Sequence, residues 1–145
     1  MAPNIRTQYM GMDLSSPVVA ASSEITSTVD NLKKLEDAGA GAVVLKSLFE
    51  EEIVADFERK QVEMQRPGPL FPETADVFDM LDTDNGVTNY LRLIREAKQA
   101  LSIPVIASIN CTTNQKWTYF SKIIQDEGAD GLELNIFRMP SDFET

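Results

Sequence analysis

The 145-residue sequence predicts an α/β fold built on a parallel sheet, and two matched pairs of segments support this prediction. Residues 37–46 are echoed by residues 126–135, each with a glycine suited to end a helix just before a short apolar run. Residues 17–22 and 104–108 form the second pair, in which a proline precedes the apolar run. Short apolar runs that end on polar residues and alternate with helices are typical of βα units.

A hairpin and four parallel strands are expected in order along the chain. Residues 5–14 predict a short hairpin that turns near residues 11–13, ahead of the sheet. Each later strand is a short apolar run that follows a proline or a glycine. The expected parallel strands are residues 17–22, 42–47, 104–109 and 131–136.

Three helices are expected between these strands, because apolar residues recur there at three- and four-residue spacing. Ser27 or Thr28 can cap the first helix, and Gly39 and Gly128 are suited to end the first and the third. The third helix follows residues 112–115, which have the spacing of a capping box. The helices are expected at about 28–38, at about 86–101 and from after residue 115 to Gly128, with inward-facing Val29, Leu32 and Leu35; Tyr90, Ile94, Ala97 and Leu101; and Trp117, Phe120 and Ile124.

One long connection interrupts the alternation of strands and helices. Residues 48–85 lie between the second strand and the second helix, and this is far longer than a usual βα loop. Residues 50–64 can form a helix, whereas the prolines between residues 67 and 72 forbid regular structure. Loops that leave strand ends lie over the binding face, so a lid or substrate-recognition element is expected here. The alternative is a surface excursion that packs on its own apolar residues.

Composition and charge narrow the classes of function. The sequence is 43% hydrophobic and 25% charged, as in globular proteins, and is expected to form a single domain over residues 1–145. A formal net charge of −10 argues against nucleic-acid binding, which depends on Lys and Arg. No apolar stretch approaches the roughly 20 residues that span a bilayer, and the N-terminus does not resemble a signal peptide. A cytoplasmic protein with a small-molecule partner and no membrane partner is expected.

Several kinds of site are excluded by the residues present. The sequence has no histidine and a single cysteine, Cys111, so the usual zinc sites, an internal disulfide and Ser-His or Cys-His catalysis are not possible within it. No metal site is expected, because the consecutive carboxylates of Glu50–Glu52 indicate a solvated charge run. Gly39 and Gly41 precede a strand instead of following one, which rejects a dinucleotide-binding fingerprint.

Polar residues at the strand ends are the candidate site. Ser22, Lys46, Ser108 and Asn135 each lie at the end of an expected strand, where ligands bind in parallel sheets. Lys46 can supply a cation to a ring or a phosphate, and the amide of Asn135 suits the edge of a heterocycle. If Glu133 faces the same way as Asn135, Lys46 is its expected partner. The alternatives are an ordinary surface lysine and a turn-forming asparagine.

The number of strands indicates an incomplete barrel. A closed (β/α)8 barrel needs eight strands and typically about 250 residues, whereas four strands are expected here. The preferred interpretation is the front half of a longer protein. Pairing of two copies and a small open α/β fold are the alternatives, and a homodimer is the expected assembly.

Four ordered segments resemble the dihydroorotate dehydrogenase family, whose members are FMN-dependent (β/α)8 barrels. The segments are residues 16–22, 39–47, 104–110 and 128–135. The resemblance extends from about residue 5 to 136 and implies the N-terminal half of a TIM barrel, with four parallel strands and a short N-terminal hairpin. It also implies an oxidoreductase of pyrimidine biosynthesis that transfers a hydride from a dihydroorotate-like substrate to FMN.

The resemblance also implies roles for individual residues. Lys46 would be catalytic, and Asn135 would bind the substrate as well as the cofactor. The cofactor-binding residues would be Ala21, Ser22, Lys46, Ser47, Ser108, Asn110 and Asn135.

The sequence departs from the pattern of this family in two places. Residues 136–140 lack the usual Cys or Ser before the proline, and residues 65–71 replace the loop that grips orotate. No general base is therefore identified, with Cys111 a distant candidate. Two other functions are considered: a lyase or aldolase that uses Lys46 as a Schiff base, and a non-catalytic half-barrel that dimerises.

Overall fold

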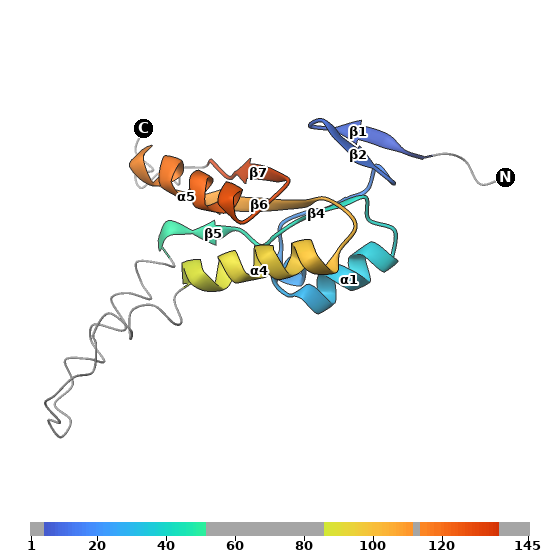
Figure 1. The fold of residues 1–145 in the computed structure, drawn as a ribbon, viewed down its shortest axis with the longest axis horizontal. Helices are drawn as coiled ribbons and strands as arrows, with labels where there is room; N and C mark the ends of the chain where they lie inside the picture. The colour runs from blue at the N-terminus through green and yellow to red at the C-terminus, as the bar shows by residue number, and fades with distance from the viewer. Residues whose placement is uncertain (1–4, 52–85, 112–113, 137–145) are drawn as a thin grey trace, which may run out of the picture.

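The computed structural model describes residues 5–51, 86–111 and 114–136, with the side chains of 114–116 left out. Within these ranges the expected α/β architecture is confirmed, with helices packed on a parallel sheet and a separate two-stranded hairpin (Figure 1). From residue 52 onward, the long connection and its expected helix lie outside the described residues. The expected capping residues 112–113 and the departure at 137–140 also lie outside them.

The hairpin forms as the sequence predicts. Strands β1 (Thr7–Tyr9) and β2 (Met12–Leu14) pair antiparallel. Met10 and Gly11 make the turn with φ values of 50° and 77°, and two consecutive positive φ angles characterise a type I′ turn. The turn thus lies at the start of the predicted position.

The parallel sheet follows the chain order of the expected strands. Strand β3 (Val19–Ala20) pairs with β4 (Ala42–Val44), which pairs with β6 (Val105–Asn110), which pairs with β7 (Gly131–Leu134). A two-residue strand, β5 (Leu48–Phe49), pairs with the far end of β6. Because β4 and β5 follow each other along the same side of β6, they form one interrupted strand. The sheet therefore has four strand positions, which is compatible with half of a (β/α)8 barrel.

Helices pack on one face of this sheet. A 3-10 helix, η1 (Glu24–Ser27), leads into α1 (Val29–Asp37), which lies beside α4 (Gly86–Ala100), and α5 (Asn114–Asp126) follows β6 (Figure 1). Thr28 occupies the predicted N-cap position of α1, but its side chain makes no capping bond to the helix. At the start of η1, the Thr26 hydroxyl accepts a hydrogen bond from the Ser23 N–H and donates one to the Ser23 carbonyl.

The core of the described residues lies between the sheet and the helices. The helix-facing side chains of the strands, such as Val43, Leu45 and Ala107, pack against Leu32, Ile94 and Ile124. All but one of the inward-facing helix residues predicted from their spacing belong to this core; Leu32, Tyr90, Ile94, Ala97, Phe120 and Ile124 are buried, and Leu35, Leu101 and Trp117 are partly buried. The prediction is wrong for Val29, which lines a cavity beside α4 instead of packing in the core.

The opposite face of the sheet changes character along the strands. Near the strand starts it is apolar, where Ala42, Val44 and Ile106 pack against Leu14 of the hairpin. Farther along β6 and β7 the same face carries Ser108 and Glu133, which are joined by a hydrogen bond. This face, here called the inner face, therefore has an apolar base and a polar rim at the carboxyl ends of the strands. Among the described residues, no helix combines the length and apolar character needed to cross a bilayer.

Candidate functional site at the strand ends

A β-bulge shapes the centre of the polar rim. Val44 pairs with Ile106 and Leu48 pairs with Ile109, so residues 45–47 stand opposite residues 107–108. One strand therefore has an extra residue, an arrangement that bends the strand and changes the direction of its side chains. Leu45 and Leu48 both face the helices. Because of the extra residue, the side chains of Lys46 and Ser47, which lie between these two leucines, do not follow the regular alternation between the two faces of the sheet.

Tyr90 of α4 fills the gap that the bulge leaves in the ladder. The backbone of Ser108 faces residues 45–47, because the neighbouring carbonyl of Ile106 accepts from the N–H of Leu45 while Ile109 bonds to Asn135 on the other side. The Tyr90 hydroxyl accepts a hydrogen bond from the Ser108 N–H at 2.8 Å and donates one to the Ser108 carbonyl at 3.0 Å. Burial raises the pKa of Tyr90, so the hydroxyl keeps the proton that it donates.

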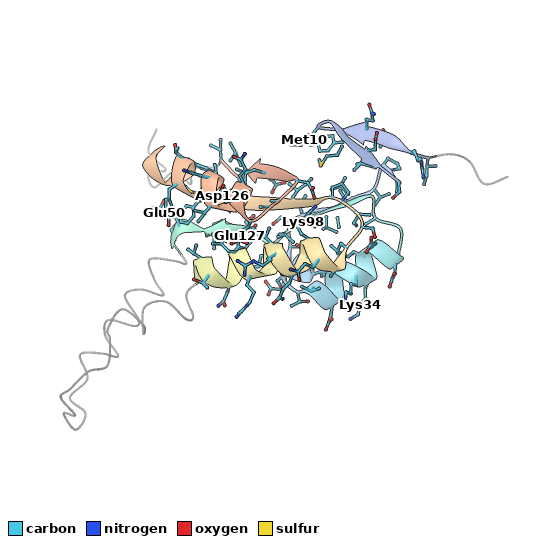
Figure 2. All side chains as sticks on the ribbon, in the orientation of Figure 1. Met10, Lys34, Glu50, Lys98, Asp126 and Glu127 are labelled. Atoms are coloured by element: carbon cyan, nitrogen blue, oxygen red, sulfur yellow. The ribbon has the colours of Figure 1, made fainter. Side chains whose placement is uncertain are left out.

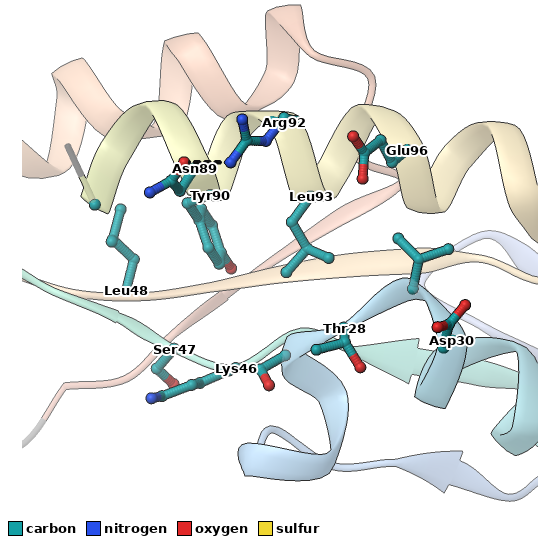
Figure 3. Close-up of a pocket in the computed structure, with 13 residues that line it drawn as sticks. Thr28, Asp30, Lys46, Ser47, Leu48, Asn89, Tyr90, Arg92, Leu93 and Glu96 are labelled. Atoms are coloured by element: carbon teal, nitrogen blue, oxygen red, sulfur yellow. Dashed lines mark hydrogen bonds between the residues drawn. The ribbon is translucent and has the colours of Figure 1, made fainter. Parts of the chain in front are cut away.

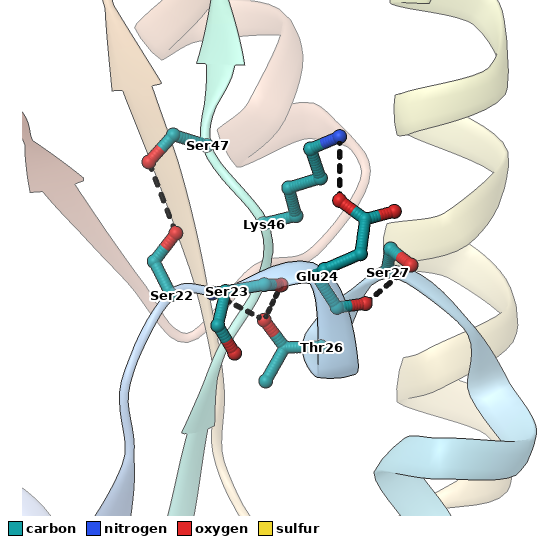
Figure 4. Close-up of polar contacts among 7 residues, drawn as sticks. All are labelled: Ser22, Ser23, Glu24, Thr26, Ser27, Lys46 and Ser47. Carbon is teal, nitrogen blue, oxygen red and sulfur yellow. Dashed lines mark hydrogen bonds and ion pairs between the residues drawn. The ribbon is translucent and has the colours of Figure 1, made fainter.

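Four side chains from successive strand positions form a continuous chain of hydrogen bonds, here called the serine relay. Its members are Ser22, Ser47, Ser108 and Glu133. The hydroxyls of Ser22 and Ser47 lie 3.0 Å apart, and those of Ser47 and Ser108 lie 2.7 Å apart. Ser108 donates to the Glu133 carboxylate at 2.7 Å. The relay thus crosses the whole inner face at the polar rim, and Figure 4 shows its Ser22–Ser47 part.

Lys46 makes an ion pair within the same group of strand ends. Its Nζ lies 2.9 Å from a carboxylate oxygen of Glu24 in η1 (Figure 4). The expected pairing of Lys46 with Glu133 is wrong, because Glu133 accepts from Ser108 instead. The lysine side chain is 40% exposed and that of Glu24 is 79% exposed, so the pair contributes at most about 1 kcal/mol to stability. Lys46 therefore lies near the rim in a largely exposed ion pair with Glu24.

A cavity of about 730 Å³ opens over the polar rim. Several predicted site residues line it, and Ser23, Glu24, Phe49, Glu133, Leu134 and Ile136 complete its wall. The predicted residues in the wall are Ala21, Ser22, Lys46, Ser47 and Asn135. The structure therefore brings together residues separated by more than a hundred positions, as expected for carboxyl ends of parallel strands.

Ser108 and Asn110 occupy a different position from the other predicted residues. Ser108 is fully buried and Asn110 is 5% exposed, and both lie behind the cavity wall. The Asn110 amide donates to the backbone carbonyl of Asn135. These two residues thus support the side chains that line the cavity, and contact with a cofactor stays a prediction for them. Cys111, considered as a base, packs in the helix-facing core.

A second cavity, of about 590 Å³, lies between α1 and α4 on the helix side of the sheet (Figure 3). It also touches Lys46 and Ser47, and Tyr90, Arg92 and Leu93 of α4 form much of its wall. Gly86 at its border follows directly on residues 52–85, which lie outside the described ranges. The cavity over the polar rim is the better candidate site, because the strand-end polar side chains face it.

Two contributors to the rim are absent from the predicted set of site residues. Glu133 is expected from the sequence only as a partner for Lys46, and Tyr90 only as a core residue of a helix. The alternation of β7 places Glu133 on the face opposite Leu132, which is a signal present in the sequence. The role of Tyr90 depends on the bulge, and the sequence pattern does not reveal the bulge. No cluster suited to a metal ion occurs among the side chains in the described ranges.

The chain has relatives among curated proteins. No family model matches it. It is 29% identical to the catalytic subunit of dihydroorotate dehydrogenase B (NAD(+)) of Thermoplasma volcanium, over 92% of this chain and 41% of that protein. It is 30% identical to the subunit of the same name from Methanocella arvoryzae, over 87% of this chain and 38% of that protein. The chain thus spans about two fifths of the length of these relatives. The resemblance predicted from four sequence segments is confirmed: over about nine tenths of its length, the chain is similar to part of these dihydroorotate dehydrogenase subunits.

Proposed function

We propose that this chain provides the first half of an FMN-dependent oxidoreductase of the dihydroorotate dehydrogenase type. The observation that supports the proposal best is the shared cavity, which Ser22, Lys46, Ser47 and Asn135 line together. The curated relatives are named as dihydroorotate dehydrogenases, and this name supports the class of reaction. The proposed substrate is a dihydroorotate-like small molecule, and the proposed setting is a homodimer in the cytoplasm.

The residues around the cavity fit the ring system of a flavin. The flavin ring has carbonyl oxygens, ring nitrogens and an imide N–H along its polar edge, so it needs both donors and acceptors. Lys46 offers donors, the serine hydroxyls offer acceptors, and the amide of Asn135 offers both. The apolar base of the inner face, around Val44 and Ile106, excludes water below the rim. Bound FMN would supply the redox chemistry, because it accepts a hydride.

The side chains of this chain would bind and orient the reactants. Lys46 would place a positive charge at the ring edge, where negative charge on a reduced flavin would be stabilised. Asn135 would orient the substrate, since its side chain lies at the end of β7 and its backbone is fixed by bonds to Ile109 and Asn110. Tyr90 would keep the bulge in place and thereby position Lys46 and Ser47.

The ion pair of Lys46 bears on the alternative function. A Schiff-base lysine must lose its proton to attack a carbonyl, and such lysines are usually desolvated or placed next to another cation. Lys46 is instead 40% exposed and paired with the carboxylate of Glu24. This exposed, carboxylate-paired environment differs from that of an activated lysine, which supports the flavin-binding role over a lyase or aldolase.

The first experiment is a titration of FMN against the protein in its native full-length form. We expect Lys46→Ala to weaken FMN binding by about tenfold or more, because a hydrogen bond from a charged donor contributes about 1.5–3 kcal/mol. The matched control is Lys122→Ala, which removes an exposed lysine from α5. Quenching of flavin fluorescence gives both dissociation constants.

Three results would contradict the proposal. Equal affinity in the two lysine variants would remove Lys46 from the flavin site. A native protein that binds no FMN would remove the flavin altogether and favour the non-catalytic half-barrel. Trapping of a carbonyl substrate on Lys46 by borohydride would instead favour the lyase or aldolase.

A further inference from the structure

The proton positions in the serine relay follow from the chemistry of its last member. An ionised carboxylate only accepts hydrogen bonds, so the single hydroxyl proton of Ser108 points to Glu133. Ser108 then has only lone pairs for Ser47, and Ser47 must donate its proton to Ser108. The same reasoning makes Ser22 the donor to Ser47. All three hydroxyl protons therefore point along the relay toward Glu133.

This direction decides what Ser22 offers to a ligand. A serine hydroxyl has one proton and two acceptor lone pairs, and Ser22 has committed its proton to Ser47. Ser22 lines the cavity over the polar rim, whereas Ser108 is fully buried. The Ser22 oxygen therefore faces the cavity as an acceptor. Without a carboxylate at position 133, the serines could donate in either direction, and this preference would be lost.

We propose that Glu133 is a positioning residue that sets the direction of the serine relay, so that Ser22 accepts a hydrogen bond from the imide N–H of a bound flavin. The inference rests on the proposed function and assigns the relay a part in recognition of the ring. It makes the site selective for heterocycles with an N–H donor at this edge. An otherwise identical ring with a methylated nitrogen would leave the Ser22 acceptor without a partner.

The position of Glu133 in the sheet agrees with this role. In β7, the register with β6 is regular and places Glu133 opposite Ser108, so the two side chains meet on the inner face. On β4, the inner face carries Val44, which packs under the hairpin. The carboxylate also lies close enough to Tyr90 that its charge contributes to the raised pKa of that hydroxyl. Glu133, at the edge of the polar rim, therefore acts on Ser108 at the centre of the rim.

The test compares FMN with N3-methylated FMN, in which the imide N–H is replaced by N–CH3. Both ligands are titrated against the native full-length protein and its Glu133→Gln variant. We expect the wild type to bind the methylated ligand at least about tenfold more weakly, and the variant to discriminate by about threefold or less. Any steric effect of the methyl group is the same in both proteins, so the change in the ratio reports the direction of the relay.

Two further variants keep the test decisive. Ser108→Ala interrupts the relay in its middle and is expected to reduce the ratio as Glu133→Gln does; it serves if Glu133→Gln does not fold. Glu127→Gln removes a carboxylate at the end of α5, away from the relay, and is expected to leave the ratio unchanged. Circular dichroism establishes that each variant is folded before its affinities are compared.

The outcomes separate this inference from the function on which it rests. A wild-type protein that binds no FMN overturns both. Binding of FMN with the same ratio in wild type, Glu133→Gln and Ser108→Ala overturns the inference and leaves the flavin proposal standing. A ratio that falls in both relay variants, with Glu127→Gln unchanged, supports the inference.

Discussion

The two matched corners of the chain begin in the same way. The first, residues 37–46, and the second, residues 126–135, each follow a helix that ends on a glycine with positive φ, 95° at Gly39 and 89° at Gly128. The N–H groups of Gly39 and Gly128 bond to carbonyls three residues back, and those of the following alanines bond to carbonyls five residues back. This is the Schellman motif in both cases. One local rule therefore ends both helices.

The corners differ two residues later, where the same backbone bond holds different side chains. The N–H of Gly41 donates to Val18 at 2.7 Å, and the N–H of Asp130 donates to Val105 at 2.9 Å. A Cβ atom at Gly41 would lie 2.0 Å from the backbone oxygen of Ser16. The carboxylate of Asp130 instead accepts hydrogen bonds from the Val105 N–H and from Lys98. At the first corner, the backbone of Ser16 leaves no room for a side chain, and this corner is here called closed. The second corner accommodates the side chain of Asp130 and is here called open.

The strands that follow also differ. Strand β7 keeps a constant register with β6, whereas the first corner leads into β4 and the bulge at residues 45–47. The regular strand presents Glu133 on the inner face, and the irregular one presents Lys46 and Ser47 at its rim. The helix end that the two corners share therefore determines the fold, whereas the parts in which the corners differ carry the candidate site residues.

The largest expected effect is at Gly41. Gly41→Ala should lower the free energy of unfolding by about 3 kcal/mol, because the new methyl group can be accommodated only by a shift of backbone, and overpacking of this kind costs about 1–3 kcal/mol or more. Urea denaturation monitored by circular dichroism measures the change. If the difference between the corners is real, the substitution should also disturb the pairing of β3 with β4.

The matched change in the second corner is Asp130→Ala. It removes the bond to the Val105 N–H and the ion pair with Lys98, both at a partly exposed site, and should cost about 1 kcal/mol. A larger loss for Asp130→Ala than for Gly41→Ala would contradict the distinction between a closed and an open corner. Gly131, next in the chain, supports the distinction, since a Cβ there would meet the side chain of Met10 at an ordinary 3.5 Å. Figure 2 labels Met10 at the tip of the hairpin.

An intermediate effect is expected at Tyr90, which fills the bulge of the first strand. Tyr90→Phe keeps the ring and removes the hydroxyl, so the buried N–H and carbonyl of Ser108 both lose their partner. The expected cost is about 2 kcal/mol, because a buried polar group without a partner costs about 1–3 kcal/mol. The same denaturation experiment measures it. A cost near zero would mean that the ladder closes without Tyr90.

The pH dependence of stability provides an independent check on Tyr90. Its pKa is raised in the folded protein, so the folded state holds the proton more tightly than the unfolded state. This contribution is complete below the unfolded pKa of about 10 and is lost as the pH rises above it. Wild type should therefore lose stability more steeply than Tyr90→Phe above about pH 10. Parallel curves for the two proteins would assign the alkaline loss to other groups.

The sequence was sufficient for the parts of the molecule that obey local rules. The glycines of the two corners, the hairpin and the apolar spacing of the helices each predict an element that the structure contains. These features depend on backbone conformation and on burial of one face, and both are determined by residues that are close together in the sequence. The expected cluster at the rim was also correct for Ser22, Lys46 and Asn135, because strand order alone brings strand ends together.

The parts that could not be predicted depend on contacts between distant residues. The bulge is defined by the pairing of residues 44–48 with β6, about sixty positions away, and its extra residue has no signature in the local pattern. The partner of Lys46 was wrong for a related reason: the path of η1 brings Glu24 to the lysine, and Ser108 is already bonded to Glu133. Opposite charges suggested an ion pair between Lys46 and Glu133, but in the structure Lys46 pairs with Glu24.

The last prediction concerns the feature that the corners share. Gly39→Ala and Gly128→Ala should each cost about 1 kcal/mol, because an alanine in the left-handed region is strained by about that amount. At either glycine, no heavy atom of the described residues, apart from those of the glycine and its chain neighbours, lies within 4 Å of the position that a methyl group would take. The cost is therefore strain of the backbone and should be equal in the two variants. Thermal and urea unfolding of both variants test this equality. A clear inequality would show that the helix ends differ too, and the contrast between the corners would then begin at the cap instead of at Gly41 and Asp130.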